Sequence, residues 1–221
     1  MSWESDEFPG RPPSHQSHTE SYEFFLRRKR QDSHVPEPHH HRRRTSGENT
    51  VRIVGGTFAG RELMSPQDFR VRPTAEHVRT ALLHALGAAI ADARVLDLFA
   101  GTGALGLEAI SRGARHVDFV ETRPSSLHAL RANIAVLRLR DRVRVFKRDA
   151  IPFAAALAAG SYEVAFADPP YGSRMLDRLI DSWLSIRFSR VLAVEHAATH
   201  VLPNGGSRTL LDQTAITIYG R

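Results

Sequence analysis

The sequence predicts an α/β protein built on a mostly parallel sheet. Between residues 93 and 196, five apolar, strand-like segments alternate with helical stretches. The chain then ends in two closely spaced strand-like segments, 207–212 and 214–219, which are typical of an antiparallel hairpin. Such alternation indicates parallel strands joined by right-handed crossovers, with helices covering both faces of the sheet.

The chain divides into a polar N-terminal part and a folded part. Residues 1–48 are poor in Val, Ile and Leu and show no periodicity, so we expect a disordered tail. Residues 49–90 predict an extension made of a hairpin, with strands near 51–55 and 60–64, and a helix capped by Thr74. Residues 91–221 form the main domain in this interpretation. Its expected strands are 93–99, 116–121, 143–149, 162–168 and 190–196, and its expected helices lie near 104–112, 124–138, 151–159 and 174–185.

Composition limits the class of function. The 221 residues include no cysteine, which excludes disulfides and thiolate chemistry, and no apolar run approaches the roughly 20 residues that span a membrane. A cytoplasmic protein without a membrane partner is expected. The net charge is +6, and the first 48 residues hold eight basic and eight acidic side chains, so the excess lies in the folded part. A basic folded surface favours nucleic acid as a partner, although an arginine-rich genome would give the same balance.

Two hypotheses concern the tail. His39, His40 and His41 could bind a metal ion, but adjacent histidines in a flexible segment offer no fixed geometry, so we expect no metal site. Val51 could be encoded by a GTG codon that is the true start codon, since GTG inside an extended reading frame is translated as valine. Gly47-Glu48 could be encoded by the ribosome-binding sequence that precedes it. Residues 1–50 are then either an upstream extension of the reading frame or a real tail that adds RNA affinity.

A glycine turn follows the first strand of the main domain. Gly101, Gly103 and Gly106 match the GxGxxG pattern, and Glu121 lies twenty residues after Gly101, as in a dinucleotide-binding fold. A NAD-dependent oxidoreductase is therefore one candidate. The C-terminal hairpin argues against it, because the second half of the dinucleotide fold repeats the strand-helix-strand unit.

The run Asp168-Pro169-Pro170-Tyr171 follows the fourth strand and indicates a different chemistry. The two prolines restrict the backbone, so that the Asp168 carboxylate and the Pro169 carbonyl are held as neighbouring acceptors. Two such acceptors suit the two N–H groups of an exocyclic amino group on guanine or adenine, and they would aim its lone pair. Tyr171 could stack on the base.

A methyl group on a sulfonium is the simplest target for such a nitrogen, because the displacement needs no metal and neutralises a charge. This chemistry indicates S-adenosylmethionine as the cofactor. The glycine turn would approach its methionine part, Glu121 would accept from the ribose hydroxyls and Asp149 from the adenine amino group. Each acid alone could be a helix cap or a surface charge. Together, four acids follow successive strands: Asp97, Glu121, Asp149 and Asp168.

The order of the motifs RIVGG, RPTAEHVRTALL, LDLFAGTGALGLEAISRGA, VETRPSSLHALRANI and FADPPY resembles one bacterial family. That family methylates the N2 amino group of one guanine in small-subunit (16S) ribosomal RNA. The resemblance covers residues 51–221. It implies a Rossmann-like class I methyltransferase fold, with a seven-stranded, mostly parallel sheet, and 16S rRNA in an assembling small subunit as the substrate. Apart from the resemblance, we expect a monomer.

The resemblance also implies roles for individual residues. Asp168, Pro169, Pro170 and Tyr171 would form the catalytic run; Asp97, Phe99, Gly101, Gly103, Glu121, Asp149 and Ala150 would bind the cofactor; Arg52, Arg61, Arg72 and Arg79 would contact RNA phosphates. Leu83 and His84 stand where many members have Phe-Asn, and the segment between the fourth and fifth strands is short. We expect His84 to have a packing or surface role rather than that of a base.

Other functions stay open at the level of chemistry. An adenine-N6 methyltransferase acting on DNA or RNA would use the same DPPY run, and only the resemblance favours guanine. A glutamine-directed protein methyltransferase is disfavoured because that group typically has Asn where Asp168 stands. A non-catalytic RNA-binding assembly factor is the alternative from another class, and it predicts that Asp168 is dispensable.

Overall fold

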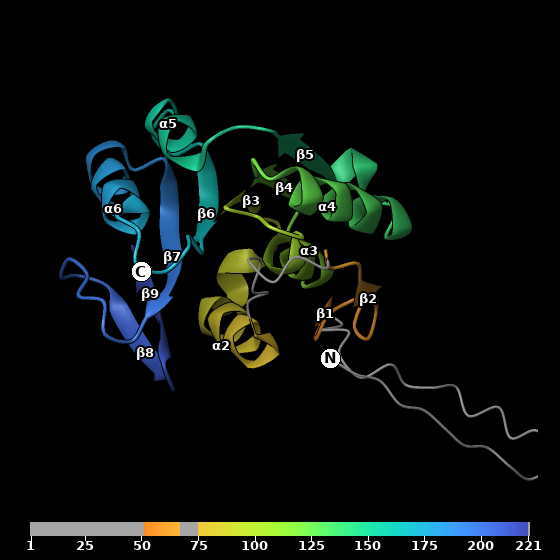
Figure 1. The fold of residues 1–221 in the computed structure, drawn as a ribbon, viewed down its shortest axis with the longest axis horizontal. Coiled ribbons are helices and arrows are strands. Elements are labelled where there is room, and N and C mark those ends of the chain that lie inside the picture. The colour runs from red at the N-terminus through yellow and green to blue at the C-terminus, as the bar shows by residue number, and fades with distance from the viewer. Residues whose placement is uncertain (1–50, 67–74, 221) are drawn as a thin grey trace, which may run out of the picture. The chain divides into compact units, whose positions relative to one another are not determined.

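A computed structural model describes residues 51–66 and 75–220. One seven-stranded sheet has the order β5-β4-β3-β6-β7-β9-β8, and β1 and β2 pair as a separate hairpin (Figure 1). The strands from β5 to β7 are parallel to one another, whereas β9 is antiparallel to both β7 and β8. The predicted fold class, a Rossmann-like sheet that ends in an antiparallel hairpin, is confirmed.

The elements lie within a few residues of their predicted positions. The strands are β1 Val51–Arg52, β2 Glu62–Leu63, β3 Arg94–Leu98, β4 His116–Val120, β5 Val143–Phe146, β6 Tyr162–Ala167, β7 Ser189–Ala197, β8 Ser207–Leu211 and β9 Thr214–Tyr219. The helices are α2 Glu76–Leu86, α3 Ala104–Ser111, α4 Pro124–Val136, α5 Ala150–Ala155 and α6 Met175–Ile186, with 3-10 turns at Gly87–Ile90 and Arg140–Arg142. The first turn of α2 is preceded by Ala75, which makes no side-chain cap. Thr74, predicted as this cap, lies outside the described residues.

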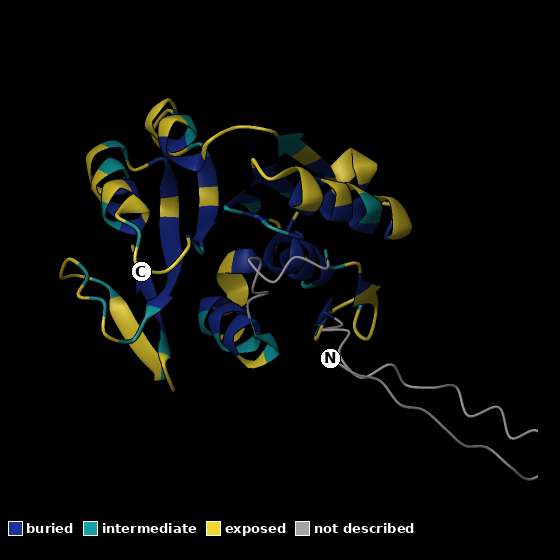
Figure 2. Ribbon diagram, viewed as in Figure 1, coloured by how far each residue is buried: buried dark blue, intermediate teal, exposed yellow. Residues whose placement is uncertain are grey.

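The central strands β3, β4, β6 and β7 are buried on both faces, which explains their nearly continuous apolar sequence, whereas the edge strand β8 is exposed (Figure 2). On one face, residues such as Val95 and Phe119 pack against α2, α3 and α4. On the other face, residues such as Leu96 and Val194 pack against α5 and α6. Successive strand residues point to opposite faces, so Val95 and Leu96 belong to different halves of the core.

The chain order creates a crevice between β3 and β6. From β3 the chain continues outward to β4 and β5, and it then returns to place β6 and β7 on the other side of β3. In open α/β sheets, ligands bind beyond the carboxyl ends of the strands at such a switch point. The acidic strand-end residues of the sequence therefore converge here.

Contacts with α3 and α4 fix the N-terminal hairpin to the main domain. The Gly56 backbone has a φ of +82°, and a Cβ there would lie 1.9 Å from the Ser111 carbonyl oxygen, so only glycine permits this approach to the end of α3. The Asn133 side chain of α4 accepts from the Met64 N–H at 2.7 Å and donates to the Thr102 carbonyl oxygen at 3.0 Å. The glycines of the RIVGG motif are thus packing residues.

Two expectations from the sequence concern membrane-spanning helices and metal sites. Within residues 51–66 and 75–220, no helix is long and apolar enough to cross a membrane. The same residues contain no group of three side chains suited to hold a metal ion. The histidine run at residues 39–41 lies outside the described part of the chain.

Candidate active site

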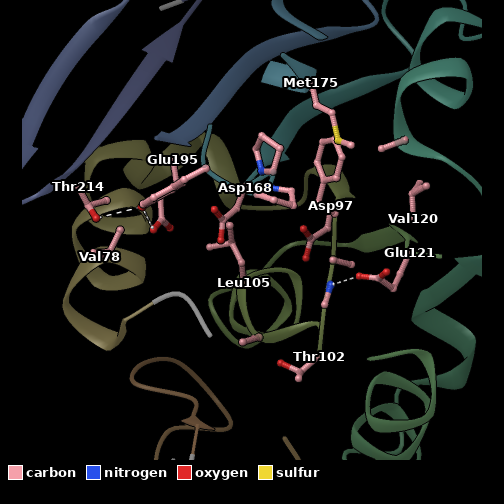
Figure 3. A pocket seen from close by; sticks show the side chains of 18 of the residues that line it. Val78, Asp97, Thr102, Leu105, Val120, Glu121, Asp168, Met175, Glu195 and Thr214 are labelled. Atoms are coloured by element: carbon pink, nitrogen blue, oxygen red, sulfur yellow. Dashed lines mark hydrogen bonds between the residues drawn. The ribbon is translucent and has the colours of Figure 1, made fainter. Parts of the chain in front are cut away.

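A cavity of about 720 Å³ opens at the carboxyl ends of the parallel strands. This volume falls within the range of about 300–1,000 Å³ that is usual for small-molecule sites. Figure 3 shows acidic side chains from β3, β4, β6 and β7 around it. The predicted site residues that line it are Asp97, Phe99, Gly101, Glu121, Asp149, Ala150, Asp168, Pro169, Pro170 and Tyr171.

Asp97 lies near the end of β3 beneath the glycine turn, and its side chain is almost fully buried. The backbone N–H of Gly106 donates to its Oδ2 at 3.0 Å. Burial, together with the charges of Asp168 and Glu121, raises the pKa of Asp97 to about 7, against the Gly106 hydrogen bond, which lowers it. A buried carboxyl in this state favours a cationic ligand group beside it.

The turn after β3 has a constrained backbone. Phe99 has a φ of +63°, a conformation that non-glycine residues rarely adopt, and Gly101 has a φ of +55°. A Cβ on Gly101 would meet only the Phe99 carbonyl oxygen, at 4.0 Å, so the space beside it is open. This turn conformation places the backbone of Phe99 and Gly101 at the cavity wall, where a bound ligand could approach it closely.

Gly103 does not have the position that the sequence predicted. It does not line the cavity, and a Cβ there would lie 2.4 Å from Leu130 Cδ1 of α4. Its φ of +80° and its place at the start of α3 make it a packing glycine. The assignment of Gly103 as a close contact of the cofactor was therefore wrong, because its Cα packs against Leu130 in the core and Gly103 does not reach the cavity wall.

Glu121 follows β4 and closes the opposite side of the turn. Its Oε2 accepts from the Gly101 N–H at 2.8 Å, and its Oε1 accepts from the N–H groups of Thr122 and Arg123, both at 2.7 Å. These backbone donors fix the carboxylate at the cavity wall. Glu121 therefore shapes the glycine turn in addition to facing the cavity.

Asp149 combines the two roles that the sequence offered as alternatives. Its Oδ1 accepts from the Ile151 N–H at 2.9 Å and so caps the first turn of α5. The same residue lines the cavity, together with Ala150 and the apolar side chain of Phe99. A flat, apolar ring with a polar edge would fit between these groups.

The DPPY run leaves the end of β6 and forms the wall opposite Glu121. Pro169 is buried, Asp168 is half-buried and Tyr171 is 48% exposed. The Tyr171 hydroxyl donates to Glu195 Oε1 at 3.1 Å and lies 3.0 Å from Thr214 Oγ1. Partial burial and the charges of Glu195 and Asp168 raise the pKa of Tyr171 to about 12, against the Thr214 hydrogen bond, which lowers it. The phenol therefore stays protonated at neutral pH.

Glu195 is a site residue that the sequence interpretation missed. It is only 7% exposed, lines the cavity and comes from β7, the strand next to β6. A charged residue directly after four buried apolar residues of a central strand could have indicated it. The predicted strand 190–196 includes Glu195, so the residue was taken as part of the sheet rather than as one of the acids at its edge.

The four arginines predicted to contact RNA have different surroundings. Arg61 and Arg52 are exposed, and Arg52 pairs with Glu76 at 3.2 Å, whereas Arg72 lies outside the described residues. Arg79 is only 1% exposed: its Nε lies 3.4 Å from Glu108 Oε2, and it donates to the Arg52 carbonyl oxygen at 2.7 Å. The prediction for Arg79 was wrong, because this guanidinium compensates a buried carboxylate. His84 is exposed and does not line the cavity.

Comparison with known proteins adds independent evidence. Residues 51–211 match the family described as "Conserved hypothetical protein 95". The ribosomal RNA small subunit methyltransferase D of Escherichia coli K12 is 38% identical over 136 residues, which cover 62% of this chain and 68% of that protein.

Two solved structures have a fold similar to that of this chain. The structure of yhhF from Escherichia coli superposes with a TM-score of 0.67 and 32% identity, covering 77% of this chain and 97% of that one. An RNA methyltransferase from Salinibacter ruber, solved with S-adenosyl-L-homocysteine, shares the fold at a TM-score of 0.54 and 14% identity, over 67% of this chain and 92% of that one. The chain therefore belongs to the family of the small-subunit ribosomal RNA methyltransferases D, as its sequence and its fold both indicate.

Proposed function

We propose that this chain transfers a methyl group from S-adenosylmethionine to the N2 amino group of a guanine in 16S ribosomal RNA. The main support for the proposal is that the DPPY run after β6 and the glycine turn after β3 line the same cavity. Asp168 and Pro169 supply two acceptors from the end of β6, and Asp97, Gly101 and Glu121 surround the neighbouring turn. The relatives named above favour this function over an adenine-N6 methyltransferase and over a NAD-dependent oxidoreductase.

The residues around the turn fit S-adenosylmethionine. When bound, this cofactor supplies a methyl group on a positively charged sulfur, with a neutral sulfide as the leaving group. Asp97, buried and with an elevated pKa, would hold the cationic amino end, and the open space beside Gly101 admits the chain. Glu121 would accept from the ribose hydroxyls, and Asp149 with Ala150 would border the adenine.

The residues of the DPPY run would prepare the nucleophile. The nitrogen of the guanine amino group is a weak nucleophile because its lone pair is delocalised into the ring. Acceptance of its two N–H bonds by the Asp168 carboxylate and the Pro169 carbonyl would favour a pyramidal nitrogen and direct the lone pair toward the methyl group. The N–C bond forms as the S–C bond breaks, and the methylated nitrogen then loses a proton to water or to Asp168.

Tyr171 would hold the plane of the base. Its hydroxyl is anchored between Glu195 and Thr214, while 48% of the residue stays exposed at the cavity. A ring fixed at one end and open along its surface can stack on a base that has left its helix, an interaction worth about 1–3 kcal/mol. Tyr171 thus acts on orientation and takes no part in proton transfer.

The substrate side of this proposal extends beyond the cavity. Residues 49–90 would face the RNA, with Arg52 and Arg61, both exposed, as phosphate contacts. We propose that the enzyme acts as a monomer in the cytoplasm, on rRNA in an assembling small subunit. Analytical ultracentrifugation of the enzyme alone and with subunits would test the stoichiometry, and a stable enzyme dimer would contradict it.

The methyl-transfer reaction itself is the test of function. Labelled S-adenosylmethionine is incubated with the full chain and with small subunits that lack the modification, and with DNA and bulk protein as competing acceptors. We expect label in 16S rRNA and only background label in the competitors. Label that appears mainly in DNA or protein would refute the proposed function.

A further inference from the structure

The Glu195 side chain lies directly beside the proposed acceptors for the amino group. In the β6–β7 ladder Ala167 is paired with Val194, and neighbouring strands lie about 4.8 Å apart. Asp168, the first residue after β6, and Glu195, in β7, directly follow this pair. Since side chains alternate along strands, both point to the face of the sheet that also carries Asp97. Figure 3 shows the Asp168 and Glu195 carboxylates on the same wall of the cavity.

The orientation of Glu195 is fixed by its neighbours. Its Oε1 accepts the Tyr171 hydroxyl at 3.1 Å, and that hydroxyl also contacts Thr214 at the start of β9. The carboxylate is thus tied to the DPPY run and, through Thr214, to the C-terminal hairpin. The Tyr171 hydroxyl is one donor to this carboxylate, and an ionised carboxylate can accept from several donors at once.

The proposed transfer step makes no use of this carboxylate. Asp168 and Pro169 already account for both N–H bonds of the amino group, and Tyr171 could stack without an acidic partner. Burial of a carboxylate at 7% exposure carries a cost in free energy, which a contribution to binding would explain.

We propose that Glu195 accepts the N1–H of the target guanine and thereby makes the site select guanine. The inference rests on the function proposed above. Guanine presents N1–H and the N2 amino group as adjacent donors, which match two adjacent carboxylates. Adenine presents its amino group beside an N1 that is itself an acceptor, so a carboxylate opposite N1 would be left without its donor and would repel the lone pair.

This role is distinct from merely anchoring Tyr171. If Glu195 only orients the tyrosine ring, its loss slows the methylation of every purine with an N2 amino group to the same extent. If it accepts N1–H, its loss changes the ratio between purines that have this hydrogen and purines that lack it. The base 2-aminopurine carries the same N2 amino group without the N1 hydrogen and separates the two cases.

The experiment uses small subunits reconstituted with ligated 16S rRNA that carries either guanine or 2-aminopurine at the target nucleotide. For the full-length wild type we expect kcat/KM to favour guanine by at least about 30-fold, because a site built around a donor rejects an analogue without it. For Glu195→Gln the preference should fall to a few-fold, since the amide can donate to an unprotonated N1. Tyr171→Phe, which removes the hydroxyl contact but keeps the carboxylate, should lower both rates and retain the preference.

Three outcomes can be told apart. If the wild type leaves guanine unmethylated at N2, the proposed function fails. If it methylates guanine and 2-aminopurine equally well, the inference about Glu195 fails regardless of how the variant folds. If Glu195→Gln lowers both rates in proportion, Glu195 positions Tyr171 only, and the inference is again overturned. Thermal unfolding and S-adenosylmethionine binding by the variant check that its cavity is intact.

Discussion

The backbone N–H of Gly106 donates to Asp97 Oδ2 at 3.0 Å across the glycine turn, and this bond only partly offsets the burial of the carboxyl. The turn therefore holds a group that is costly to ionise next to the proposed cofactor position. Replacement of Asp97 by a neutral residue is therefore expected to raise the stability of the free protein and to lower its affinity for the cofactor.

Asp97→Asn should stabilise the free protein at pH 8. The folded pKa of about 7 lies above the ordinary value of 3.8, so the contribution of Asp97 to stability is largest below about pH 4 and is lost as the pH rises to 7. An asparagine removes this cost, and we expect a gain on the order of a few kcal/mol at pH 8 that nearly vanishes at pH 4. Urea unfolding at both pH values measures the difference. A gain that is equal at the two pH values would contradict the assignment.

The same substitution should weaken cofactor binding. Without the negative charge, the cationic amino end of S-adenosylmethionine loses its partner, and we expect the Kd to rise at least tenfold, a change of about 1.4 kcal/mol. Calorimetric titration at pH 8 checks this expectation. Unchanged affinity would show that the cation lies elsewhere.

Asp168→Asn should reduce methyl transfer without abolishing cofactor binding. The amide replaces an acceptor by a donor opposite the amino group, and the loss of one such preorganised contact costs about 100- to 1,000-fold in rate. Single-turnover rates on unmodified subunits measure the loss. Glu163→Gln is a matched control, since Glu163 lies near the start of β6, the strand that Asp168 follows, and accepts from the Arg94 N–H at 2.6 Å. A non-catalytic assembly factor would tolerate both substitutions.

Arg79 and Arg61 should separate stability from RNA binding. Glu108 is fully buried and pairs with Arg79 and, at 2.8 Å, with Arg112, so removal of the Arg79 guanidinium takes away half of its compensating charge, and we expect Arg79→Ala to cost about 3–5 kcal/mol in unfolding free energy. Arg61→Ala should leave the melting temperature unchanged and lower the salt dependence of RNA binding by about one phosphate contact. An Arg79→Ala protein of normal stability and weaker RNA affinity would restore the original prediction.

Substitution of Gly101 and of Gly103 by alanine should have different effects on stability and on cofactor binding. Gly103→Ala places a Cβ against Leu130 at a φ of +80°, so we expect a loss of about 2–4 kcal/mol in stability. Gly101→Ala, with a φ of +55° and open space around the Cβ, should cost only about 1–2 kcal/mol and weaken S-adenosylmethionine binding. Denaturant unfolding and calorimetry compare the variants. Equal effects on both properties would contradict the assignment of Gly103 to packing.

The sequence predicted the sheet and most of the cavity because both depend on local patterns. Buried parallel strands have nearly continuous apolar sequences, so they can be located in the sequence. Acidic residues that follow such strands lie at the same edge of the sheet, formed by the carboxyl ends of the strands. The side on which a single residue faces does not follow from such patterns. Arg79 and Gly103 were misassigned because their surroundings, Glu108 and Leu130, come from other helices. Glu195 was missed because its strand continues past the site, to Ala197, whereas β6 stops before Asp168.

The central claim is tested most directly by nucleoside mass spectrometry of 16S rRNA after reaction of the full chain with unmodified small subunits. The account predicts one new N2-methylguanosine per subunit with the wild type, and its formation at a rate lower by about 100-fold or more with Asp168→Asn. New N6-methyladenosine, or N2-methylguanosine formed equally by both proteins, would contradict it.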